Sequence, residues 1–250
     1  MDEVRAAPIE LTDALVDEVR DALEARNTVL ATALAQPLHP ADLADLLERL
    51  SPEERSSLIA AFGPAFDADT LAYLDEFVRD RVIEALGPEA AGLVVAQLDT
   101  DDAVEVLGDL DEEEQAAILA ALPLPERAAI EQGLAFPEYS AGRLMQREVV
   151  AVPDYWTVGQ AIDYLRAHPG LPDEFYDLFL IDPRFRVVGV VPLSRVLRSR
   201  RATPMLELRL KELRAFAADT DQEEVARAFR RYGLVTAPVV DAGGRLLGQI

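Results

Sequence analysis

The chain has 250 residues, of which 50% are hydrophobic and 28% charged, as in folded proteins rather than disordered ones. It has no cysteine, which excludes disulfides and thiolate metal sites, and its net charge of −22 repels nucleic acid and anionic lipid. No run of about 18 apolar residues is present, and the N-terminus lacks the pattern of a secretion signal. We therefore expect a cytoplasmic chain of two domains that binds cations or basic surfaces and no nucleic acid.

The first predicted element is a helix from Asp13 to Leu34, with Thr12 as its N-cap. A twelve-residue repeat follows it. Each repeat starts with a large apolar residue, usually continues with a helix-starting residue and often proline, and has mostly apolar residues eight and nine positions later. Thr70 is the one exception at the eighth position. The repeat positions are Leu38, Leu50, Phe62, Leu74, Leu86, Leu98, Leu110 and Leu122.

This pattern predicts helices of about eight residues, each with one apolar stripe. Helices of that length are unstable alone in water, so the repeats must stack on one another. We expect an all-α superhelical array of short helices within a domain that spans residues 1–135.

Acidic residues are concentrated in one part of the array. Between Val82 and Glu126 there is no lysine or arginine, and Asp101, Asp102 and Glu105 fall in the early turns of one predicted helix. Asp101 and Glu105 are four residues apart, where like charges repel unless something neutralises them. Acids that favour a helix N-terminus explain the cluster equally well at this point.

The pattern changes after the segment 136–146, which we interpret as a linker. Period-2 and period-3.6 segments then alternate in the order β-α-β-β-α, first in a module at 147–203 and again in a module at 204–250. The predicted strands are 149–152, 178–181, 187–191, 215–217, 235–240 and 245–250, and the predicted helices are 157–168, 193–199 and 221–232. The fold class is therefore α+β.

These two modules resemble CBS modules. The resemblance rests on Leu180-Ile181-Asp182 with Val188-Gly189-Val190-Val191, and on Pro238-Val239-Val240-Asp241 with Arg245-Leu246-Leu247-Gly248. CBS modules pair, and a pair can bind an adenine nucleotide in its cleft. The final helix of the second module is missing, which predicts that the natural polypeptide continues beyond Ile250.

A short-helix array followed by a tandem CBS pair resembles the cytosolic region of the MgtE family of magnesium transporters. Three segments are similar to that family: 39–43 at the start of the array, 136–145 in the linker, and 219–226 at the start of the second CBS helix. The resemblance implies a magnesium sensor for a dimeric membrane channel, on the cytoplasmic side of the cell membrane. It implies a homodimer through the CBS modules and a membrane pore domain in the same polypeptide.

The resemblance also implies a set of metal ligands. Asp101 and Glu105 match interface acids of the family, Asp102 is their neighbour, and Glu223 matches an acid of the second CBS helix. Magnesium prefers oxygen ligands and keeps several waters, so each site needs one or two carboxylates from each side. We expect several weak interfacial Mg²⁺ sites.

The sequence departs from the family at three positions. Thr70 and Gly233 stand where the family has acids, so the metal sites that those acids build are expected to be weakened or absent. Arg195 takes the place of the aspartate that contacts ribose in nucleotide-binding members, and an arginine has no acceptor for ribose hydroxyls. ATP binding is therefore disfavoured.

Other functions remain open at this point. An adenine-nucleotide-sensing CBS regulator whose array binds a protein partner is the main alternative, and a plain helical scaffold is another. Catalysis is not expected, because His39 and His168 are the only histidines and neither is near the acidic cluster in the sequence.

Overall fold

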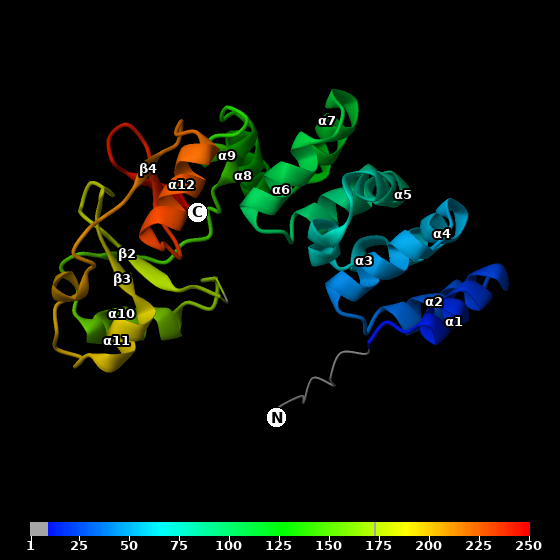
Figure 1. Cartoon of the computed structure of the whole chain (residues 1–250), viewed down its shortest axis with the longest axis horizontal. Helices are drawn as coiled ribbons and strands as arrows, with labels where there is room; N and C mark the ends of the chain where they lie inside the picture. Colours follow the sequence, from blue (N-terminus) through cyan, green and yellow to red (C-terminus); the bar gives the residue numbers. More distant parts are fainter. Residues whose placement is uncertain (1–9, 173) are drawn as a thin grey trace. The chain divides into compact units, whose positions relative to one another are not determined.

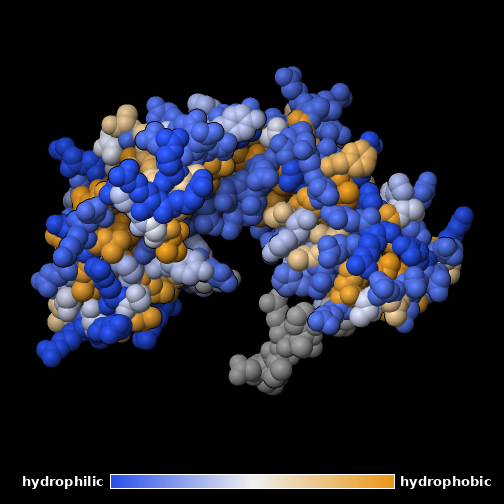
Figure 2. Space-filling view, viewed as in Figure 1, coloured by the Kyte–Doolittle hydropathy of each residue, from blue (hydrophilic) through white to orange (hydrophobic). Residues whose placement is uncertain are grey.

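The computed structural model describes residues 10–172 and 174–250; the residues that precede Glu10 in the domain predicted at 1–135 lie outside the described residues. The chain divides into two units. One holds the residues up to Leu98 together with Glu105–Arg127, and the other holds Asp99–Val104 together with Ala128–Ile250. Hydrophilic side chains predominate on the face of both units seen in Figure 2, as the charge of −22 predicts.

The N-terminal segment forms two helices where the sequence predicted one. Helix α1 (Asp13–Glu24) begins at Thr12, whose hydroxyl accepts a hydrogen bond from Leu15 N, as predicted. The prediction of a single helix to Leu34 is wrong. The backbone turns at Arg26 with a φ of 57°, and a new helix, α2 (Thr28–Ala35), begins with Asn27 as its N-cap. Arg26 N and Asn27 N donate to the last carbonyls of α1, which closes that helix with a left-handed residue.

The array has the predicted succession of short helices (Figure 1), and six of the eight repeat positions are buried. Its helices are α3 (Pro40–Arg49), α4 (Pro52–Phe62), α5 (Glu76–Val95), α6 (Thr100–Gly108), α7 (Glu112–Ala121) and α8 (Leu124–Leu134). Helix α5 covers two repeats, with a break at Gly87, where φ is 72° and only glycine is unstrained.

One repeat departs from the α-helical prediction. The segment after Phe62 forms two 3₁₀ turns, η1 (Gly63–Ala65) and η2 (Ala68–Tyr73). Thr70, the polar exception in the repeat, is fully buried there, and its hydroxyl has no hydrogen-bond partner within the described chain. An acid at this position would be buried in the same surroundings.

A side chain five residues after several repeat positions holds the end of the preceding helix. Arg55 Nε donates to Leu47 O at 2.7 Å, and Gln115 Nε2 donates to Leu107 O at 2.7 Å. Arg127 donates in the same way to Leu122 O at 3.2 Å. Since the last carbonyls of a helix have no partner within it, these side chains cap α3, α6 and α7 from the following repeat.

The two modules follow the short helix α9 (Ala141–Leu144), and the predicted order of their elements is confirmed, β-α-β-β-α in the first and β-α-β-β in the second. Each sheet has three strands, with the first strand parallel and the third antiparallel to the central one. The first module contains β1 (Ala151–Pro153), α10 (Val158–Ala167), β2 (Asp177–Ile181), β3 (Val187–Pro192) and α11 (Leu193–Arg198). After η3 (Met205–Leu208), the second contains β4 (Phe216–Ala217), α12 (Gln222–Tyr232), β5 (Pro238–Val240) and β6 (Leu246–Gln249).

The two modules join through their hairpins. Val187 N donates to Gly244 O and Leu246 N donates to Phe185 O, both at 3.1 Å. Asp182 closes the turn of the first hairpin by accepting two backbone N–H groups, and these bonds lower the pKa of its carboxyl. Asp241 does the same in the second hairpin, so the two turns are built alike.

Candidate functional site

The first candidate site is the acidic start of α6. Thr100, the first residue of the helix, is only 6% exposed, and both its donors point to the carboxylate of Glu148. Thr100 Oγ1 lies 2.6 Å from Glu148 Oε1, and Thr100 N lies 3.3 Å from Glu148 Oε2. Gln146 Nε2 donates to Asp99 Oδ2 at 2.6 Å. The turn that carries the predicted ligands Asp101 and Asp102 is therefore held from outside the helix.

Asp101 is a carboxyl with a strongly raised pKa. Burial raises its pKa from 3.8 to about 6, and the charge of Asp102 adds to this effect. Asp101 Oδ1 is buried without a hydrogen-bond partner in the described chain. A carboxylate oxygen in this position is stabilised by a cation, and Mg²⁺ prefers such oxygens.

Glu105, four residues further along α6, has a protein counter-ion. Arg79 of α5 is almost fully buried, and its guanidinium pairs with Asp109 and lies 3.6 Å from Glu105 Oε1. Sequence reasoning missed this contact because Arg79 lies just before the stretch without basic residues. The signal was present, since Arg79 occupies the same repeat position as Arg55 and Arg127.

The fourth predicted ligand, Glu223, lies in the first turn of α12, where the side chain is 82% exposed. Its nearest basic partner is Arg227, at 3.8 Å. Gly233, which departs from the family pattern, lies at the other end of α12 and has a φ of 61°, a conformation that explains a glycine there. In the part of the chain that the structure describes, no group of three or more acids or histidines is arranged to hold a metal ion by itself.

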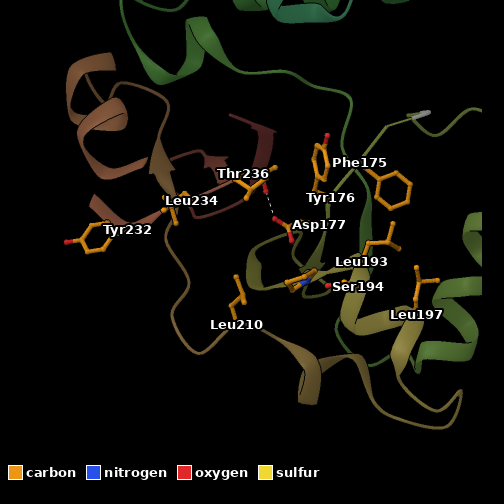
Figure 3. Close-up of a pocket in the computed structure, with 13 residues that line it drawn as sticks. Phe175, Tyr176, Asp177, Leu193, Ser194, Leu197, Leu210, Tyr232, Leu234 and Thr236 are labelled. Atoms are coloured by element: carbon orange, nitrogen blue, oxygen red, sulfur yellow. Dashed lines mark hydrogen bonds between the residues drawn. The ribbon is translucent and has the colours of Figure 1, made fainter. Parts of the chain in front are cut away.

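A second candidate site is a cleft of about 590 Å³ between the two modules. Aromatic and aliphatic side chains form most of its walls, among them Phe175, Tyr176, Leu193 and Leu234 (Figure 3). Its polar feature is Asp177, whose Oδ2 accepts a hydrogen bond of 2.6 Å from Thr236 Oγ1 across the cleft. An apolar pocket with a few polar groups suits a flat organic ring.

The lining of this cleft contains no lysine or arginine among the described residues. Arg195 is not part of the lining, because its Nη1 donates to Leu208 O at 2.9 Å and to Arg209 O at 3.1 Å. The guanidinium thus stabilises the segment that connects the two modules. A smaller depression of about 340 Å³ shares four residues with the cleft and contains Lys211 and Arg214. Arg214 is already paired with Glu212 at 2.9 Å and stacked on the ring of Tyr232. The cleft fits the base of an adenine nucleotide better than its phosphates.

A helical repeat domain joined to two such modules defines a class of proteins with paired CBS domains. Residues 38–139 match the family model of the MgtE intracellular N domain, and residues 141–202 and 208–250 match that of the CBS domain. The chain belongs to the MgtE family.

Known relatives agree with this assignment. The magnesium transporter MgtE of Thermus thermophilus is 28% identical over 243 residues, which make up 96% of this chain and 54% of that protein. The MgtE of Bacillus subtilis is 27% identical over 213 residues, 85% of this chain and 47% of that protein. The chain thus spans about half the length of these relatives. No helix in the described ranges has the length and hydropathy needed to cross a bilayer.

Two solved structures share the fold. The soluble part of a magnesium transporter matches with a TM-score of 0.81 and 23% identity, over 95% of this chain and 94% of that one. The cytosolic domain of the Mg²⁺ channel MgtE in complex with ATP matches with a TM-score of 0.84 and 27% identity, over 94% and 96%. These matches confirm the predicted combination of a helical array and a CBS pair.

Proposed function

We propose that the chain is the magnesium-sensing regulatory region of a magnesium transporter or channel, on the cytoplasmic side of the membrane and without catalysis. The observation that carries the proposal is Asp101, whose buried, unpartnered oxygen and raised pKa mark a carboxylate that lacks a positive partner. Asp102 stands beside it on the same turn. Membership in the MgtE family makes Mg²⁺ the cation to test first.

The mechanism follows from charge. Without Mg²⁺, the acids of α6 repel other acidic surfaces of the same protein, and screening confines this repulsion to about 8 Å at physiological salt. Mg²⁺ keeps several waters and takes one or two carboxylates from each side, so it bridges surfaces that otherwise repel. We propose that Asp101, Asp102 and Glu105 face such weak sites, that Glu223 serves a further one, and that their occupation closes the helical domain onto the CBS pair.

We also propose which parts of the protein respond to this closure. A membrane pore domain of the same polypeptide would shut when Mg²⁺ is plentiful, and a homodimer through the CBS domains would bring two sensors to one pore. The relatives are named magnesium transporters and are about twice as long as this chain, which supports a further domain in them.

Small-angle X-ray scattering with and without millimolar MgCl₂ tests the proposal, with NaCl at equal ionic strength as control. We expect a smaller radius of gyration with Mg²⁺ and no comparable change with Na⁺. Limited proteolysis under the same conditions should show slower cleavage with Mg²⁺. If neither the radius of gyration nor the cleavage pattern changes with Mg²⁺, the proposed sensor function is excluded.

Single variants separate the ligands. Asp101→Ala should raise the Mg²⁺ midpoint of the scattering change by about tenfold, because it removes the carboxylate that gains most from a cation. Glu105→Ala should raise it less, since Arg79 already neutralises part of that charge. An unchanged midpoint in the double variant Asp101→Ala with Glu105→Ala would show that neither residue is a ligand.

The cleft between the CBS domains favours a second function, adenine-nucleotide sensing, in which the array binds a protein partner. One related cytosolic domain has been solved in complex with ATP. In this chain we expect ATP to bind no more tightly than adenosine, since no basic side chain among the described residues lines the cleft. Isothermal titration calorimetry of both ligands, with Asp177→Ala as the variant that damages the cleft, checks this. ATP binding tenfold tighter than adenosine would favour the nucleotide sensor.

A further inference from the structure

Glu148 links the first turn of α6 to a distant part of the chain. It lies 48 residues from Thr100 in the sequence, yet its carboxylate accepts both donors of that residue and also the backbone N–H of Arg147, at 3.1 Å. The first N–H groups of a helix have no partner within it, and a negative group at this end is also favoured by the helix dipole. Glu148 therefore acts as a distant cap for α6.

The cap is tied to the second CBS domain. Gln146 and Gln249 exchange backbone hydrogen bonds of 2.8 Å in both directions, and Gln249 Nε2 also donates to Gln146 Oε1 and to Glu148 O. The adjacent Gly248 allows this close pairing, since a Cβ there would lie 2.4 Å from Gln146 O. A continuous set of hydrogen bonds thus runs from β6 through Gln146 and Glu148 to the first turn of α6.

We infer that Glu148 is a positioning residue for the acidic turn of α6, and that it sets the orientation in which Asp101 and Asp102 meet a cation. The coupling to Mg²⁺ rests on the proposed function, whereas the anchoring of the turn does not. Glu148 acts through its hydrogen bonds to Thr100 and not as a metal ligand.

Amide hydrogen exchange of the full chain, measured without Mg²⁺, tests the anchoring. In Glu148→Ala the amides in the first turn of α6 should exchange about tenfold faster, because the turn loses its cap. Glu148→Gln keeps an acceptor oxygen and should stay within about twofold of the wild type. The exposed Glu89 provides the matched control, and Glu89→Ala should change nothing in α6. Unchanged exchange in Glu148→Ala overturns the inference, whatever Mg²⁺ does.

The Mg²⁺ midpoint then tests the coupling. Glu148→Ala should raise it about fivefold, Glu148→Gln much less, and Thr100→Val, which leaves Glu148 in place, should raise it as well. The double variant Thr100→Val with Glu148→Ala should resemble Glu148→Ala alone, because both changes break one interaction. Equal midpoints in Glu148→Ala and Glu148→Gln, both well above the wild type, would show that Glu148 acts by charge or ligation and would overturn the positioning role. If the wild type itself ignores Mg²⁺, the proposed function fails while the exchange result still decides the anchoring.

Discussion

At Asp101, burial and charge conflict directly. Between about pH 4 and pH 6 the folded protein keeps a proton on Asp101 that the unfolded chain has already released, since burial raises the pKa from 3.8 to about 6. The folded state binds more protons in this window, so the contribution of Asp101 to the free energy of unfolding falls as the pH rises through it. Above about pH 6 the full cost of the charge is present.

Asp101→Asn should therefore stabilise the Mg²⁺-free protein. Well above pH 6 we expect the free energy of unfolding to rise by about 1–2 kcal/mol, after allowance for the partial exposure of the side chain. Below pH 4 the variant and the wild type should be equally stable. Urea denaturation at the two pH values measures this, with the exposed Asp21→Asn as the matched control. Equal stability at high pH would mean that the carboxylate carries no cost.

The same residue links stability to pH in the proposed sensor. Since Mg²⁺ binds the deprotonated carboxylate, the Mg²⁺ midpoint of the wild type should rise as the pH falls below about 6, and that of Asp101→Asn should depend much less on pH. Scattering titrations at several pH values measure both. Parallel pH profiles for the two proteins would contradict the role of Asp101 as ligand.

At the scale of elements, the array is a chain of helices in which a repeat caps the helix of the repeat before it. The arginine or glutamine five residues after a repeat position caps the preceding helix, as Arg55, Gln115 and Arg127 do. Arg79 occupies the same position but pairs with Asp109 and Glu105, so one repeat position serves helix capping in some repeats and charge neutralisation in another.

Arg55→Met should destabilise the helical unit by about 1–3 kcal/mol, because it leaves the carbonyls of Leu47 and Leu50 without their donors while it keeps the aliphatic part of the side chain. Arg81 is an exposed arginine of the same unit whose ion pair is with Glu84, so Arg81→Met should stay within about 0.5 kcal/mol of the wild type. Urea unfolding followed by far-UV circular dichroism compares them. Equal losses of unfolding free energy in both variants would show that the buried cap contributes no more to stability than the exposed arginine.

At the scale of the whole molecule, a net charge of −22 acts on every cation that approaches. The Debye length falls from about 10 Å at 0.1 M salt to about 3 Å at 1 M, so added NaCl weakens the attraction for Mg²⁺ as well as the repulsion between acidic surfaces. Between these concentrations the Mg²⁺ midpoint should rise by about threefold to tenfold. Scattering titrations at both concentrations provide the measurement. A Mg²⁺ midpoint that does not change with NaCl would indicate that Mg²⁺ binds by local coordination alone.

Much of this organisation could be predicted from the sequence. The period of twelve in the array and the periods of 2 and 3.6 in the modules reflect which side chains must be buried, and the predicted order of strands in the CBS pair is confirmed. The single helix at Asp13–Leu34 was wrong because a left-handed Arg26 and the cap of Asn27 interrupt an otherwise continuous apolar pattern. The α-helix expected after Phe62 was replaced by 3₁₀ turns. The assignment of Mg²⁺ to Asp101, Asp102, Glu105 and Glu223 stays a prediction.

The sequence by itself determined the fold class, the two kinds of domain and the unusual concentration of acids, because these depend on periodicity and composition along the chain. Only the tertiary structure decided which acids lack a counter-charge. It pairs Glu105 with Arg79, leaves an oxygen of Asp101 buried without a partner, and brings Glu148 to Thr100. The physical reason is that burial and hydrogen bonding arise between residues far apart in the chain, and a local pattern shows which residue types recur but not which partners they contact.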